Sequence, residues 1–132
     1  MSRLFLGDGP LVWTGKYPPT DARLRLTLEL VTAGRIMGTI EYVDDGTITN
    51  IQGKMAETPH QLSGDDLWPD RSEWPESSER VALQFKEVSI RTAGRRRPDL
   101  NGEYRVIASS SNLAGAWISA GRMVGHFTMR RS

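Results

Sequence analysis

The sequence predicts one all-β domain over residues 1–132, an eight-stranded antiparallel up-and-down β-barrel. Three observations support this fold class: a glycine-centred phrase recurs, apolar and polar residues alternate, and no 10–15-residue helical period separates the strands. The phrase reads apolar–any–Gly–any–apolar and occurs six times, at residues 13–17, 36–40, 51–55, 100–104, 113–117 and 123–127. Glycine inside a strand usually marks a bend or a close approach of backbones, and a sheet that closes needs such bends repeatedly.

The first half of the chain contains four predicted strands, at residues 11–17, 22–30, 35–43 and 47–55. Pro18 and Pro19 end the first strand. In the second strand, five apolar residues from Ala22 to Leu30 alternate with polar ones. We therefore expect one face of this strand to be buried and the other to be exposed to solvent. Gly34 turns the chain into the third strand, and Asp44-Asp45-Gly46 forms a hairpin because Asp-Gly readily supplies positive φ.

A long loop at residues 56–79 follows, rich in proline and acidic residues, and we expect at most one short helical turn in it. Strands then resume at residues 80–91, 100–108, 112–119 and 121–130. In the first of these the apolar phase slips after Phe85, which predicts a β-bulge near Lys86 and Glu87. A basic loop is expected at residues 94–99.

Composition limits the function classes. The net charge of +1 provides no general attraction to nucleic acid or membranes, so we expect neither as a partner. There is no cysteine, which excludes disulfides and thiolate chemistry. No apolar run is long enough for a signal peptide or a membrane span, so we expect a cytoplasmic protein. No motif predicts a cofactor or a metal site, since Asp44-Asp45 reads as turn chemistry and the two histidines lack ligand spacing.

The strand rhythm resembles the calycin-type barrels, especially the avidin and streptavidin family. The features that carry the resemblance are the early Trp13-x-Gly15, the Gly-x-apolar-x-Gly hairpin around Gly38, the late Gly115-x-Trp117 and the closing phrase at residues 124–128. The resemblance implies a barrel with a ligand pocket at one mouth and pocket-wall aromatic residues comparable to Trp13, Tyr42 and Trp117. It does not imply biotin binding, because residues 17–19 replace the polar residues that hold the ligand in that family.

Aromatic residues supply the candidate ligand site. Six of them fall on the predicted interior phase: Trp13, Tyr17, Tyr42, Tyr104, Trp117 and Phe127. They either form a packed core or line a cavity at the barrel mouth, and we take Trp13, Tyr17, Tyr42 and Trp117 as ligand-binding candidates. Trp68 and Trp74 lie in the polar loop, where they could cover a mouth as a lid, tuck against the barrel wall or anchor a protein partner.

Charge clusters supply a second set of candidates. Arg95, Arg96 and Arg97 form a basic hairpin tip, and the loop from Glu57 to Glu79 holds seven acidic residues. The arginine tip could bind phosphate, be a solvated loop or meet the acidic loop of a neighbouring subunit, and we expect a homo-oligomer. Outward apolar residues would also gain cover in such an assembly; they are Met37, Val43, Ile107 and Val124.

The leading functional hypothesis is a non-catalytic binding protein that holds a small, mostly apolar ligand in the barrel mouth. The alternative is a filled barrel that acts as a protein-interaction or oligomerisation module through the acidic Trp-Pro loop or the arginine tip. We do not expect an enzyme, because no catalytic motif is present. A barrel enzyme would need a polar group buried among the aromatic residues, for which Asn50, Gln52 and Glu87 are the candidates.

Overall fold

The chain folds into a closed barrel of eight antiparallel strands, which confirms the predicted fold class. The computed structural model describes residues 11–17, 22–32, 34–62, 67–76, 79–95, 100 and 102–131, without the side chains of residues 17 and 30–32. The strands are β1 (Leu11–Tyr17), β2 (Ala22–Thr32), β3 (Arg35–Tyr42), β4 (Thr47–Ala56), β5 (Val81–Thr92), β6 (Glu103–Ala108), β7 (Asn112–Ser119) and β8 (Arg122–Arg131). Every predicted strand is present, with ends shifted by three residues at most.

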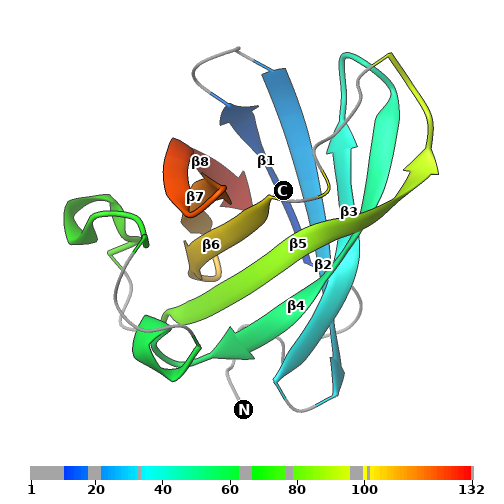
Figure 1. Ribbon diagram of the computed structural model, residues 1–132. Helices are drawn as coiled ribbons and strands as arrows, with labels where there is room; N and C mark the ends of the chain where they lie inside the picture. Colours follow the sequence, from blue (N-terminus) through cyan, green and yellow to red (C-terminus); the bar gives the residue numbers. More distant parts are fainter. Residues whose placement is uncertain are drawn as a thin grey trace.

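Each strand pairs with its neighbours in the sequence, and β8 returns to pair with β1. Trp13 lies opposite Arg131 and Lys16 opposite Thr128 in the closing pair. In Figure 1 the β3–β4 hairpin and the end of β5 lie at the upper end of the barrel, whereas the β4–β5 connection leaves from the lower end. Closure leaves neither β1 nor β8 as an exposed sheet edge.

The interior is built from the inward phase of every strand, as the alternation predicts. Leu24, Leu26 and Leu28 of β2 are buried, and the polar residues between them are more exposed. Trp13, Tyr42, Tyr104 and Phe127 belong to the same core cluster, and Trp117 packs against it. These aromatic residues therefore occupy the interior phase that the sequence predicts.

The glycine phrase marks places where another group occupies the position of a side chain. A Cβ atom built on Gly38 would overlap the carbonyl oxygen of Thr27 in β2. At Gly115 the Phe127 ring from the opposite residue of β8 fills the same space. Gly15, Gly53 and Gly102 share this feature. The phrase therefore reports close packing inside a strongly curved sheet.

The described strand pairs shift register at four places, and two of these β-bulges, one in β5 and one in β8, leave a valine on the outside. In β5 the register with β4 shifts between the pairs Asn50–Ser89 and Ile51–Glu87, so Val88 is the extra residue. This confirms the predicted bulge, and it leaves Glu87 buried and Val88 exposed. A second shift makes Val124 the extra residue in β8. Met123 is consequently exposed, so the sixth glycine phrase does not place both of its apolar residues in the core.

The 57–80 segment is folded against the outside of the barrel. The described residues of this segment contain two short 3-10 turns, η2 (Pro59–Gln61) and η3 (Arg71–Glu73), where the sequence predicted at most one turn. Trp68 forms a small satellite core with Ala82 of β5 and Ile107 of β6. Both barrel residues belong to the outward phase, between neighbours that join the interior core. Ile107, predicted to be an exposed wall residue, is therefore covered by the segment.

Replacing Gly38 by Ala tests the role of these glycines. The new methyl group would overlap β2 backbone, and we expect a loss of about 1–3 kcal/mol in the free energy of unfolding, as for other overpacked sites. Urea denaturation measures it. The matched control is Gly46→Asn, because Gly46 has a φ of +78° with open space around it and Asn tolerates that conformation. Equal stability losses in the two variants would contradict the interpretation.

Candidate functional site

Seven side chains of the barrel core leave little space between them. The space enclosed among seven apolar and aromatic core residues measures about 10 Å³; they are Leu24, Leu26, Ile40, Phe85, Tyr104, Phe127 and Met129. That is room for one water at most, whereas ligand pockets hold roughly 300 Å³ or more. Trp13 is completely buried in this core. The side chain of Tyr17 lies outside the described residues.

A carboxylate lies in this interior, held by three hydroxyl groups. Tyr42 and Thr49 donate to one oxygen of Glu87 at 2.9 and 2.6 Å, and Tyr104 donates to the other at 2.8 Å. The four residues come from β3, β4, β5 and β6. All four residues are buried. The three hydroxyl groups therefore supply the hydrogen bonds that Glu87 would make with water if it were exposed. The pKa of Tyr104 lies well above its usual value, chiefly because of burial and also because Tyr42 and Glu87 are close.

Glu87 is the only one of the three predicted interior polar candidates that faces inward. Asn50 lies on the outside, where its amide donates to the Ser89 hydroxyl at 2.9 Å, and Gln52 is exposed. The sequence signal that distinguishes Glu87 is its position two residues after Phe85, on the inward phase and just before the bulge. Its three described hydroxyl partners link β5 to β3, β4 and β6, and the network thereby holds these strands in register.

Trp68 and Trp74 do not form a lid over the barrel mouth, which corrects that part of the prediction. Trp68 is buried against the outer wall of β5 and β6, and Trp74 packs partly buried on the same cluster. The Trp74 indole nitrogen donates to the Pro69 carbonyl at 2.8 Å, which fixes the ring within the segment. The second alternative, packing against the barrel's own wall, describes both residues.

The packing of this segment leaves a groove of about 740 Å³ between the segment and the barrel wall. Its lining combines aromatic, apolar and charged side chains: Glu57, Thr58, Pro59, His60, Trp68, Pro69, Asp70, Arg71, Trp74, Arg80, Val81 and Ile107. The guanidinium carbons of Arg71 and Arg80 lie 5.0 and 5.2 Å from the centre of the Trp74 ring. Arg80 also donates to the Pro75 carbonyl at 3.3 Å. Two cationic groups are thus positioned beside an aromatic face.

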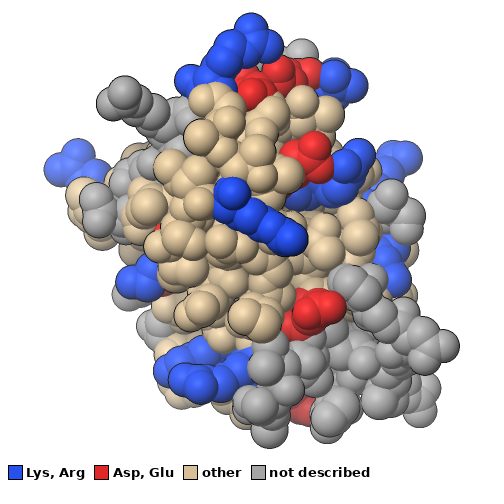
Figure 2. Space-filling model, turned by 90° about the vertical axis from the view of Figure 1, so that its right-hand side faces the viewer, with Lys and Arg blue, Asp and Glu red and all other residues tan. Residues whose placement is uncertain are grey.

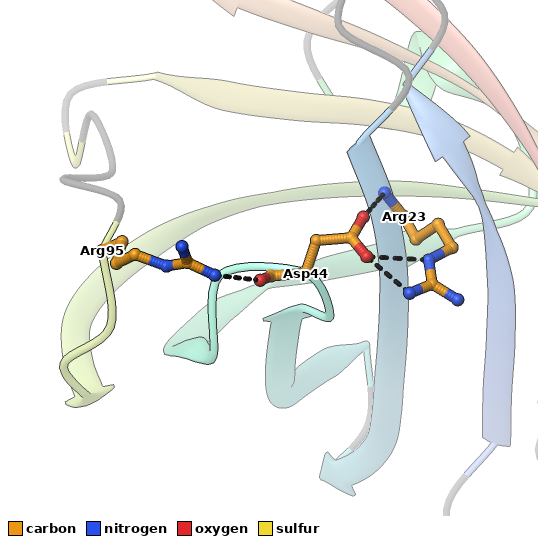
Figure 3. A network of polar contacts seen from close by, with 3 residues as sticks. All are labelled: Arg23, Asp44 and Arg95. Carbon is orange, nitrogen blue, oxygen red and sulfur yellow. Dashed lines mark hydrogen bonds and ion pairs between the residues drawn. The ribbon is translucent and has the colours of Figure 1, made fainter.

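The predicted arginine tip is partly built into the barrel end. Figure 3 shows Arg95 and Arg23 on either side of Asp44 in the β3–β4 turn. Arg95 donates from its guanidinium to the Asp44 carbonyl at 3.1 Å and from its backbone to the Asp45 carbonyl at 3.2 Å. Arg95 therefore ties the start of the β5–β6 connection to the hairpin, and its role in partner binding stays a prediction. Arg96 and Arg97 lie outside the described residues.

Arg23 holds the other side of Asp44. Its guanidinium donates twice to the Asp44 carboxylate, and its backbone N–H donates to the second carboxylate oxygen at 3.4 Å. These hydrogen bonds lower the pKa of Asp44 below its usual value and raise that of Arg23. The β2 strand is thereby linked to the turn that also receives Arg95.

Within the described ranges, no three His, Asp or Glu side chains gather as metal ligands. No helix in that part of the chain has the length and apolar character needed to cross a membrane. No protein-family model matches the chain, and the comparison with curated proteins finds no match.

The raised pKa of the buried Tyr104 predicts that the protein loses folding stability at alkaline pH. The folded state retains the Tyr104 proton, while the unfolded chain releases it near pH 10, so this contribution to stability is lost as pH rises above that value. We expect Tyr104→Phe to lower stability at pH 8 but to lose less of it between pH 10 and 11.5 than the wild type. Urea midpoints measured across this range test it, and parallel curves would show that Tyr104 does not contribute.

Asp44 predicts the opposite pH dependence. Because its folded pKa is lowered by Arg23, its contribution is present above the ordinary value of 3.8 and is lost as pH falls through the lower folded value. We expect Asp44→Asn to reduce stability at pH 7 and to narrow that difference below pH 4. Denaturation at pH 7, 4 and 2.5 provides the measurement. A difference that is unchanged at pH 2.5 would refute the role of this ion pair.

Proposed function

We propose that this chain is a non-catalytic binding module in which a filled barrel presents the groove beside the 57–80 segment to a protein partner. The observation that supports it best is a difference in volume. The outer groove measures about 740 Å³, whereas the space among the seven core residues measures about 10 Å³. The outer volume lies in the range of ligand sites. Tryptophan and arginine, the residue types that most often dominate binding energy, both line it.

The lining favours an extended peptide segment that carries one acidic and one apolar side chain. Arg71 and Arg80 offer guanidinium groups to a carboxylate, which they can bind through paired hydrogen bonds. Val81 and Ile107 provide an apolar floor beside Trp74. Glu57 and Asp70, on the same lining, supply acceptors for peptide N–H groups. A hydrocarbon ligand would leave these charges without partners, whereas a peptide has groups for each.

The small-ligand hypothesis stays a prediction, and the side chain of one of its candidate residues, Tyr17, lies outside the described ranges. Two of the candidate ligand-binding residues have other contacts in the structure. Trp13 belongs to the sealed core, and the hydroxyl of Tyr42 is bonded to Glu87. The interaction-module alternative therefore has the better support.

The closed up-and-down barrel is compatible with a calycin-type fold. Membership of the avidin and streptavidin family remains a proposal that rests on the short motifs around Trp13, Gly38 and Trp117. Biotin is not the expected ligand, since Tyr17-Pro18-Pro19 stands where that family places its polar ligand-binding residues. The proposed peptide groove lies outside the barrel and does not depend on that resemblance.

Selection from a displayed library of random 12-residue peptides tests the proposal. We expect enriched peptides to contain Asp or Glu next to an apolar residue, and synthetic copies to bind in fluorescence polarisation. Arg71→Glu combined with Arg80→Glu should weaken binding at least tenfold, or about 1.4 kcal/mol, because both cationic contacts are reversed.

The matched control is Arg91→Glu combined with Arg122→Glu, which changes the net charge equally at exposed positions outside the groove lining. This control should stay within twofold of the wild type. Circular dichroism checks that the variants remain folded. Failure to enrich any peptide, or equal losses in the two double variants, would refute the proposed site.

A further inference from the structure

The last part of β5 is paired along one side only. β6 pairs with β5 from Val81 to Lys86, and β6 begins at Glu103, which lies opposite Lys86. β5 continues to Thr92, and this remaining part pairs with β4. Figure 1 shows β5 extending well past the start of β6. Among the described residues, no strand or loop other than β4 pairs with residues 88–92, which we call the β5 edge.

The side chains of the β5 edge are exposed on both faces of the strand. All five residues are exposed: Val88, Ser89, Ile90, Arg91 and Thr92. Val88 and Ile90 are 41% and 46% exposed, which is high for large apolar side chains. An exposed strand edge offers backbone N–H and C=O groups that can pair with another chain. Because three of the five residues are β-branched, the β5 edge suits the addition of a further strand.

The β5 edge is complementary to a second copy of itself. When two copies run antiparallel about a two-fold axis at Ile90, Val88 of one copy lies opposite Thr92 of the other. Ser89 then lies opposite Arg91, and the two Ile90 side chains meet at the axis. Cross-strand pairs of β-branched residues are stabilising, whereas like charges placed opposite one another are destabilising. This register provides the first kind of pair and avoids the second.

The irregularities of β5 limit the length of such a contact. Val88 and Arg91 are the extra residues at two register shifts against β4, and bulges increase the twist of a strand. β6 occupies the edge as far as Lys86, so the free stretch is short. The Ser89 hydroxyl accepts a hydrogen bond from Asn50 of β4, on the side away from the β5 edge. We therefore expect a weak contact that forms at high protein concentration.

Charge neither drives nor blocks this contact. Figure 2 views the molecule from the side on which β5 ends in Figure 1, and charged side chains of both signs are scattered over a largely uncharged surface. Next to the β5 edge, Lys86 lies opposite Glu103 in the sheet, and Arg95 donates to the Asp44 carbonyl. Arg91 is the one charged residue within the β5 edge itself. Backbone pairing and apolar contact would hold two copies together, so added salt should have little effect.

We propose that two copies of this chain associate by antiparallel pairing of their β5 edges, with Ile90 on the two-fold axis. One sheet then continues from the first barrel into the second. Because both copies use the same residues, the contact is isologous and ends at a dimer. This inference is independent of the peptide groove, whose lining shares no residue with the β5 edge.

Sedimentation velocity of the whole chain from 5 to 500 µM tests the association. We expect a monomer–dimer equilibrium that persists at 500 mM salt. Ile90→Lys and Ile90→Glu each place like charges opposite one another at the axis, so each should weaken dimerisation at least tenfold. A mixture of these two variants should recover a dimer, because opposite charges then meet. The matched control is Met37→Lys, since Met37 is 41% exposed on β3, which pairs along both sides.

Cross-linking tests the register. The chain has no cysteine, so Ile90→Cys introduces a single thiol. Opposite residues of antiparallel strands have Cα atoms about 4.5–5.5 Å apart, a separation that a disulfide can span. Oxidation of Ile90→Cys should therefore give a covalent dimer on a non-reducing gel, whereas Met37→Cys should stay monomeric.

Four outcomes would overturn the proposal. They are a monomeric wild type at 500 µM, dissociation of the dimer at 500 mM salt, dimerisation that survives Ile90→Lys, and equal cross-linking of the two thiol variants. Dissociation by salt would indicate a contact between charged surfaces instead. Circular dichroism checks the fold of each variant, and should Ile90→Lys unfold, the thiol variants carry the test.

Discussion

Closure of the sheet through the pairing of β1 with β8 is the constraint on which the rest of the structure depends. Eight strands closed on themselves enclose room for their own side chains or for one small ligand. Where the wall curves most tightly, glycines such as Gly38 admit the neighbouring backbone, and at Gly115 an aromatic ring takes the vacant place. The described interior side chains form one hydrophobic core, and a groove of about 740 Å³ lies on the outside.

The Glu87 network is the polar exception inside this core. A buried carboxylate is costly without partners, and here three hydroxyl groups from three other strands surround it. Each donor must stand at the correct height on its strand, so the network favours one register of β3 to β6. The bulge at Val88 has two effects: it ends the inward phase at Glu87 and turns apolar surface toward solvent.

The outer wall of the barrel is asymmetric. Around β5 and β6 the 57–80 segment covers Ala82 and Ile107, so outward-facing residues there behave as core. Around β3 and β4 no described segment covers the wall, and Met37 and Val88 remain exposed among cations. Within the segment, Arg71 and Arg80 stack on the Trp74 ring, and Glu73 and Glu76 line a groove that also contains Arg130.

The sequence by itself determined the barrel, its eight strands, the β3–β4 turn and the bulge, because alternation and turn chemistry are local properties that the chain displays directly. It also placed Trp13, Tyr42 and Trp117 on the inward phase. Only the tertiary structure decided what these residues do there. That Tyr42 bonds Glu87, that Trp68 covers the outer wall and that Arg95 braces a turn depends on contacts between residues far apart in the chain, which no local pattern encodes.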